Sequence, residues 1–94
     1  MMDDSTIGSK AYKISNKLGI LSSYIGEYDG QVKRYEKLEA DAKRLFEETG
    51  DSNHQITAYN YETQKLEADL RRHTALVKWN SIISKAALQL KEHE

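Results

Sequence analysis

The sequence predicts an all-α protein: a coiled-coil-like, antiparallel two-helix hairpin in a single domain over residues 1–94. In both halves of the chain, apolar side chains recur at alternating spacings of three and four residues. This spacing keeps one face of a helix against a neighbouring helix. The chain has no proline, and 31% of its residues are charged, a composition typical of long helices with wide solvent-facing surfaces. A single cluster of turn-forming residues, 49–53, separates the two halves.

The first helix is predicted over about residues 5–48. From residue 7 to residue 35, every position of the repeat is apolar or aromatic: Ile7, Ala11, Ile14, Leu18, Leu21, Ile25, Tyr28, Val32 and Tyr35. The strict repeat would next fall on Glu39. The sequence therefore favours a shift of one residue, a stammer, that continues the apolar stripe at Leu38, Ala42 and Leu45.

Two glycines in the first helix leave an alternative open. A glycine inside a helix costs about 0.8–1 kcal/mol relative to alanine, so a break at Gly26–Gly30 would give a three-helix bundle. The neighbouring apolar residues Ile25, Tyr28 and Val32 stay in phase across this segment, which favours one continuous helix.

The turn is predicted at residues 49–53. Gly50 can adopt the left-handed conformation that ends a helix. Ser52 and Gln55 have the spacing of a capping box, in which each side chain bonds the backbone N–H of the other residue. The second helix is therefore expected over about residues 53–92.

The second helix carries its own stripe, which we interpret as the face toward the first helix. The stripe comprises Ile56, Tyr59, Thr63, Leu66, Leu70, His73 and Val77, followed by Asn80, Ile83, Ala87 and Leu90. A polar residue in such a stripe can fix the register of paired helices, and Asn80 is the candidate for that role. Thr63 is a weaker candidate.

The short connection forces the two helices to run antiparallel. Counting outward from the turn places Glu36 near Leu66, Tyr28 near His73 or Thr74, and Leu21 near Asn80 or Ser81.

Further apolar residues lie beside these stripes. Two helices alone leave the flanks of both stripes in water, and a surplus of exposed apolar surface marks an interaction site. We therefore expect dimerisation into a four-helix bundle, or a protein partner. The predicted interface residues are Trp79, Tyr12, Tyr24, Ile20, Leu76 and Ile82.

Charge is segregated although the formal net charge is only −1. Residues 27–69 hold eleven acidic and six basic residues. Residues 5–26 and 70–91, which the hairpin brings together toward its open end, hold eight basic residues and no acidic one: Lys10, Lys13, Lys17, Arg71, Arg72, Lys78, Lys85 and Lys91. This dipole favours antiparallel self-association or an acidic partner. A nucleic-acid accessory factor that uses the basic open end is a less favoured alternative, since no reader motif accompanies the basic residues.

No reactive chemistry is predicted. His54, His73 and His93 are widely separated, and the chain has neither a metal-binding histidine motif nor a glycine-rich phosphate loop. There is no cysteine for a disulfide framework. We therefore expect no catalytic residues, no cofactor and no bound metal.

No membrane span is expected, because the chain lacks a run of about 20 apolar residues. It begins Met-Met-Asp-Asp, without the basic and apolar regions of a secretory signal. A cytoplasmic location is expected, with signal-independent export left open.

These features predict a non-enzymatic protein–protein interaction module of the adaptor, chaperone or inhibitor type. In architecture, the chain resembles small hairpin proteins of bacterial secretion systems: needle-type subunits, their chaperones and secreted Trp-x-Gly dimers. Its turn, Thr49 to Asn53, lacks the proline of a needle subunit. Trp79 lies far from the turn and is followed by Asn80, unlike the tryptophan of a Trp-x-Gly protein. The resemblance therefore covers size and shape, and a secretion or other assembly subunit is the alternative function.

Overall fold

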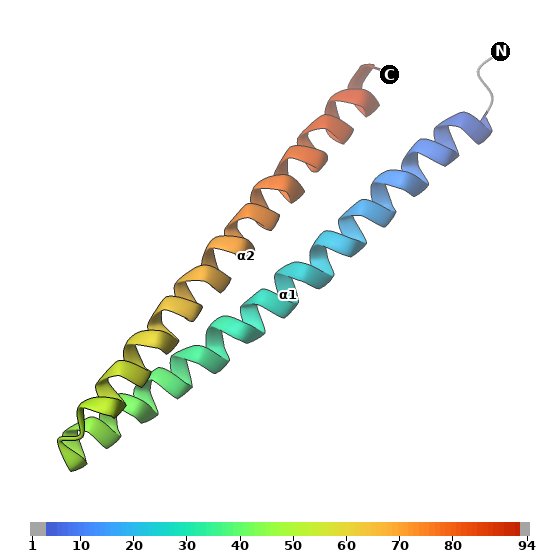
Figure 1. Cartoon of the computed structure of the whole chain (residues 1–94). Coiled ribbons are helices and arrows are strands. Elements are labelled where there is room, and N and C mark those ends of the chain that lie inside the picture. The colour runs from blue at the N-terminus through green and yellow to red at the C-terminus, as the bar shows by residue number, and fades with distance from the viewer. Residues whose placement is uncertain (1–3, 93–94) are drawn as a thin grey trace.

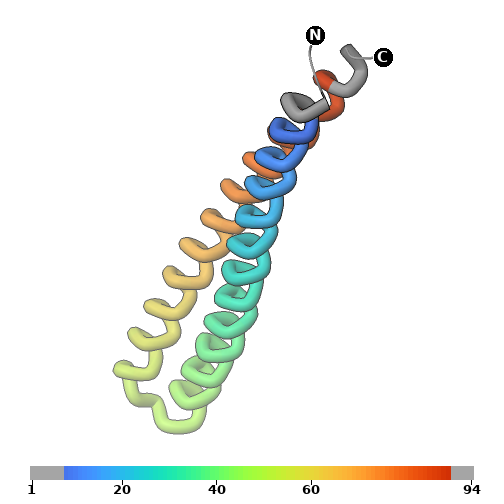
Figure 2. Tube along the Cα trace, turned by 90° about the vertical axis from the view of Figure 1, so that its right-hand side faces the viewer, coloured from blue at the N-terminus to red at the C-terminus, as the bar shows by residue number. Residues whose placement is uncertain are grey.

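Two long helices form an antiparallel hairpin. The computed structural model describes residues 4–92, with side chains over residues 8–89. Helix α1 spans Asp4–Thr49 and helix α2 spans Ser52–Glu92, and they pack lengthwise in a rod of 74 × 17 × 13 Å (Figure 1). The N-terminal end of α1 and the C-terminal end of α2 lie at the same end of the rod, opposite the turn (Figure 2). The predicted helical hairpin is confirmed.

Helix α1 runs without interruption through the two glycines at its centre. Both Gly26 and Gly30 are exposed, and a Cβ atom at either position would have no neighbour within 4 Å. The apolar residues beside them hold the helix in phase against α2. The three-helix alternative is therefore wrong.

The connection between the helices is only Gly50 and Asp51. Gly50 has a φ of 69° and donates its N–H to the Phe46 carbonyl at 2.7 Å, which ends α1 in the left-handed manner predicted. The cap of α2 differs from the prediction. Asp51 Oδ1 accepts the Asn53 N–H at 3.0 Å, so Asp51 is the N-cap and Ser52 is already helical.

The face of α1 that packs against α2 follows the predicted repeat from Ile14 to Tyr35, where every position is half-buried. Ala11 is exposed, and the side chain of Ile7 lies outside the described residues. Beyond Tyr35 the predicted stammer is wrong, because the strict repeat continues through Glu39, Ala42 and Phe46. Of the residues predicted there, Leu38 is half-buried and Ala42 is buried, whereas Leu45 is exposed; Glu39 is buried.

The face of α2 that packs against α1 is not the predicted one. Every described member of the predicted stripe is exposed, Asn80 and His73 included, and the side chain of Leu90 lies outside the described residues. The buried or half-buried residues form a different strict repeat, which we call the α2 seam: His54, Ala58, Tyr61, Lys65, Ala68, Arg72, Ala75, Trp79, Ile82 and Ala86. Asn80 therefore cannot fix the register of the hairpin.

Side-chain volume explains this choice of face. The α1 face presents large residues, so a row of small residues opposite lets the two backbones approach closely and the side chains interlock. Ala58, Ala68 and Ala75 provide that row and are among the most buried residues described. Leu66 and Leu70 at the same surface would add bulk that the large α1 side chains leave no space for.

The predicted register along the rod agrees with the structure. Leu21 and Ser81 line one shared hollow, and Tyr28 and Thr74 line another. Nearer the turn, the rings of Tyr35 and Tyr61 stack across the helices with centroids 6.3 Å apart. Within residues 4–92, neither helix has a stretch long and apolar enough to cross a membrane.

Candidate interaction surface

A row of exposed, mainly apolar side chains runs along the solvent side of α2. We call it the outer stripe and define it as Ile56, Tyr59, Thr63, Leu66, Leu70, His73, Val77, Asn80 and Ile83. Leu66 is 59% exposed and Leu70 is 66% exposed, values unusual for leucines with no covering partner. The outer stripe lies on the side of α2 away from the seam, because its residues fall about half a turn from the seam residues.

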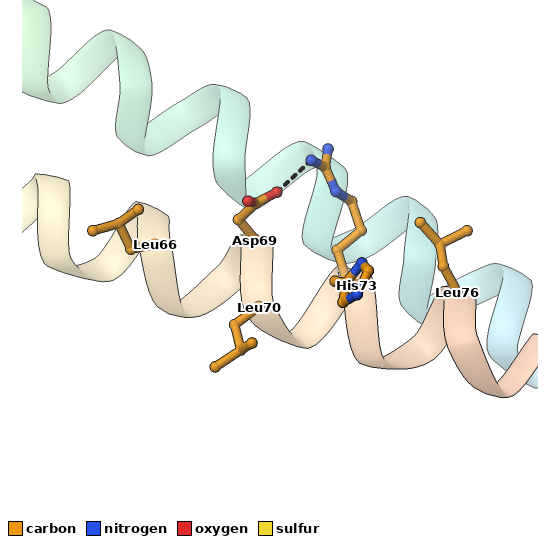
Figure 3. A pocket seen from close by; sticks show the side chains of 6 residues that line it. Leu66, Asp69, Leu70, His73 and Leu76 are labelled. Atoms are coloured by element: carbon orange, nitrogen blue, oxygen red, sulfur yellow. Dashed lines mark hydrogen bonds and ion pairs between the residues drawn. The ribbon is translucent and has the colours of Figure 1, made fainter.

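The middle of the outer stripe borders an open hollow, seen in Figure 3. Leu66, Leu70, His73 and Leu76 line it together with Asp69 and Arg72. In Figure 3 the side chain of Leu70 points away from α1. Leu70 also borders a hollow shared with Leu21, Tyr24 and Tyr28 of α1. Most of the surface of Leu66 and Leu70 is nevertheless exposed and free to contact another helix.

A buried carboxylate ties the two helices together nearer the turn. Glu39 is 7% exposed, and its Oε1 accepts a hydrogen bond from Lys43 Nζ at 3.2 Å. Its Oε2 accepts no hydrogen bond but lies 3.4 Å from Lys65 Nζ on α2. Burial raises the pKa of Glu39, but the ammonium groups of Lys43 and Lys65 outweigh burial, so the pKa is lowered overall.

A second charged cluster joins the helices at mid-length. Arg72 donates to Asp29 Oδ1 on α1 at 2.7 Å and also pairs with Asp69 one turn away on α2 (Figure 3). Lys33 lies 3.2 Å from the other oxygen of Asp29. The positive charges of Lys33 and Arg72 lower the pKa of Asp29. Both clusters hold the helices in register and leave the outer stripe uncovered.

The predicted interface residues divide into two groups. Trp79 and Ile82 are half-buried members of the α2 seam, so at least part of each side chain is occupied within the hairpin. Tyr12, Ile20, Tyr24 and Leu76 are exposed. The structure does not gather the six into one surface, because Tyr12, Ile20 and Tyr24 lie on α1 and the outer stripe lies on the far side of α2.

The basic open end is partly neutralised. Arg72 is held by Asp29 and Asp69, whereas the other basic residues predicted there are exposed: Lys10, Lys13, Lys17, Arg71, Lys78 and Lys85. Lys91 lies outside the described side chains. A nucleic-acid role and a place in a secretion apparatus stay predictions.

Across the described residues, no group of three or more histidine, aspartate or glutamate side chains has the arrangement of a metal site. His54 belongs to the α2 seam, His73 belongs to the outer stripe, and His93 lies outside the described residues.

Sequence reasoning missed the alanine row and Lys65 as hairpin contacts. One signal was available: positions 54, 58, 61, 65, 68, 72, 75, 79, 82 and 86 form a second repeat of alternating four and three residues. It combines alanines with long basic side chains, whose apolar stems cover a neighbouring helix while their charges reach acidic groups. Glu39 and Asp29 are the acidic groups that such a repeat requires on α1.

Comparison with known proteins found no match: no family model fits the chain, and neither a curated protein nor a solved structure is similar to it.

Proposed function

We propose that this chain is a non-enzymatic protein–protein interaction module that binds a helix through the outer stripe of α2. The observation that carries the proposal is the exposure of a mainly apolar repeat of three and four residues, about 40 Å long at 1.5 Å per residue, on a hairpin whose seam is formed by other residues. Apolar residues repeated every three and four positions fit a helix laid lengthwise against them.

The thin core of the hairpin supports the same proposal. Among the described residues, the buried apolar side chains are four alanines, and no large side chain is fully buried. The chain exposes 7348 Å², whereas a compact monomer of 10.8 kDa exposes about 5,500 Å². The excess is larger than the roughly 800 Å² that each partner buries in a standard protein interface.

The proposal is tested by capture from a lysate of the source cells, with an untagged copy of the chain added. The immobilised wild-type chain is compared with a Leu66→Asp/Leu70→Asp variant and a matched control, Asn16→Asp/Ser23→Asp. The control changes two exposed α1 positions on the side of α1 away from α2. All three chains should keep the hairpin, because exposed substitutions change stability by about 0.5 kcal/mol or less.

We expect the wild type and the control to retain a bound helical protein, either the added copy or another chain, and the Leu66→Asp/Leu70→Asp variant to lose it. Fluorescence of Trp79, the single tryptophan and a seam residue, reports whether each hairpin is intact. Equal retention by all three chains, or retention by none, would contradict the proposal.

A further inference from the structure

The outer stripe is complementary to itself along its length. It places apolar residues near both ends, Ile56 and Ile83, with Leu66 and Leu70 near the middle. When two such stripes lie antiparallel, each end meets the opposite end and the middle meets itself. This is the isologous contact of a two-fold dimer, in which one surface serves both partners.

Charge beside the outer stripe selects the relative direction of the two helices. Before Leu70, α2 exposes Glu62, Glu67 and Asp69, the last of which is paired with Arg72. After Leu70, it exposes Arg71, Lys78 and Lys85. Parallel helices would set like charges at the same level, whereas antiparallel helices set the acidic part of each level with the basic part of the other.

One flank shows the complementarity residue by residue. Glu67, Arg71, Thr74 and Lys78 are spaced by four, three and four residues and are all exposed, so they lie along one flank between the outer stripe and the seam. Arg71, Thr74 and Lys78 also line a hollow shared with α1. A two-fold axis perpendicular to the helices keeps this flank of both copies on the same side. With the axis near Leu70, Glu67 of one copy lies level with residue 73 of the other, between Arg71 and Lys78.

We propose that the helix bound by the outer stripe is α2 of a second copy of this chain, antiparallel and centred near Leu70; this inference rests on the function proposed above. The two α2 helices form the centre of the dimer, and each α1 stays outside on its own seam. The charged clusters around Glu39 and Asp29 remain within each hairpin, so dimerisation needs no rearrangement of the monomer.

Solution mass tests the pairing. Sedimentation of the full chain across micromolar to millimolar concentrations is expected to show a monomer–dimer equilibrium that saturates at the dimer. The Leu66→Asp/Leu70→Asp variant is expected to stay monomeric, and the Asn16→Asp/Ser23→Asp control is expected to dimerise like the wild type. A wild-type monomer at every concentration, a growing polymer, or a dimer indifferent to the stripe substitutions would overturn the inference.

Disulfide trapping tests the direction, and the absence of native cysteine makes each introduced thiol unique. Leu70→Cys is expected to crosslink with itself. Ile56→Cys is expected to crosslink with Ile83→Cys on another copy but not with itself, since antiparallel pairing sets the two Ile56 positions about 40 Å apart. A self-crosslink of Ile56→Cys would indicate parallel helices and overturn the inference.

The two proposals fail separately. If lysate capture through the outer stripe succeeds while the pure chain stays monomeric, the binding function stands and the second copy is excluded as occupant. If capture from lysate and from the added copy both fail, the binding function itself is excluded.

Discussion

At the scale of single residues, two glycines have opposite effects on stability because their backbone geometries differ. Gly50 is held at a φ of 69°, whereas Gly26 has helical geometry with open space around it. For residues other than glycine, the left-handed conformation costs roughly 1–2 kcal/mol. Inside a helix, in contrast, alanine is favoured over glycine. The two glycines therefore form a matched pair.

Gly50→Ala should lower the free energy of unfolding by about 1–2 kcal/mol, because Cβ is strained at positive φ. Gly26→Ala should raise it by about 0.5–1 kcal/mol, because alanine restricts the unfolded chain and fits the helix. Urea denaturation followed by circular dichroism at fixed protein concentration measures both. A stabilising Gly50→Ala substitution would contradict the observed turn.

The buried carboxylate predicts unequal roles for two lysines. The Lys65 side chain is 26% exposed and bridges to Glu39, whereas the Lys33 side chain is 75% exposed and pairs with Asp29. Removing one partner of a buried pair leaves a poorly compensated charge, while an exposed pair contributes little. Lys65→Ala should cost about 1–2 kcal/mol, reduced from the fully buried case because Lys43 remains. Lys33→Ala should cost under about 0.5 kcal/mol. Equal losses in urea denaturation would contradict this assignment.

Acid should weaken the hairpin through Glu39. Its pKa in the folded chain lies below the ordinary value of 4.5, so its stabilising contribution is present above that value and is lost as the pH falls through the folded pKa. Asp29, whose pKa is also lowered, acts in the same direction. The thermal midpoint should therefore fall as the pH drops below about 4.5. Glu39→Gln should flatten this fall, and Glu36→Gln, at an exposed position, should leave it unchanged.

At the scale of the helices, the seam depends on small residues in α2. Ala68 is 3% exposed, whereas Ala40 on α1 is exposed to solvent. Close packing leaves little room for larger groups at a buried alanine, so the spacing between α1 and α2 is set by the alanine row. Volume added at Ala68 must push the helices apart.

Ala68→Leu should lower the free energy of unfolding by about 1–3 kcal/mol through overpacking. Ala40→Leu, with similar helix propensity and no packing constraint, should change it by less than about 0.5 kcal/mol. Thermal denaturation at constant protein concentration measures the difference. A neutral Ala68→Leu substitution would indicate that α2 uses another face against α1.

The sequence predicted the elements better than their contacts. The α1 repeat from Ile14 to Tyr35 identified the correct face because no other repeat on that helix is comparably apolar. On α2 two repeats have equal spacing, and hydrophobicity favoured the stripe through Leu66 and Leu70, which the structure exposes. The stammer was predicted on α1 because Glu39 is charged. Glu39 is buried nevertheless, because it pairs with Lys65, a residue 26 positions away in the sequence.

At the scale of the whole molecule, dimerisation should couple stability to concentration. A ligand that binds only the folded state raises the midpoint of unfolding, and in the proposed dimer a second copy is that ligand. The thermal midpoint of the wild type should therefore rise as protein concentration increases. The midpoint of the Leu66→Asp/Leu70→Asp variant should be independent of concentration, as measured by circular dichroism from micromolar to millimolar chain. A wild-type midpoint that does not move would contradict self-association.

By itself, the sequence determined two long helices, a reversal at Gly50 and the face that α1 presents to its neighbour. These follow from local properties: helical periodicity, the absence of proline, and the conformational freedom of one glycine. Only the tertiary structure decided which face of α2 meets α1. That decision depends on complementary volume and charge across the two helices, where Ala58, Ala68 and Ala75 admit the large α1 side chains and Glu39 compensates Lys65. The result places the more apolar face of α2 outside, where it is available to a partner.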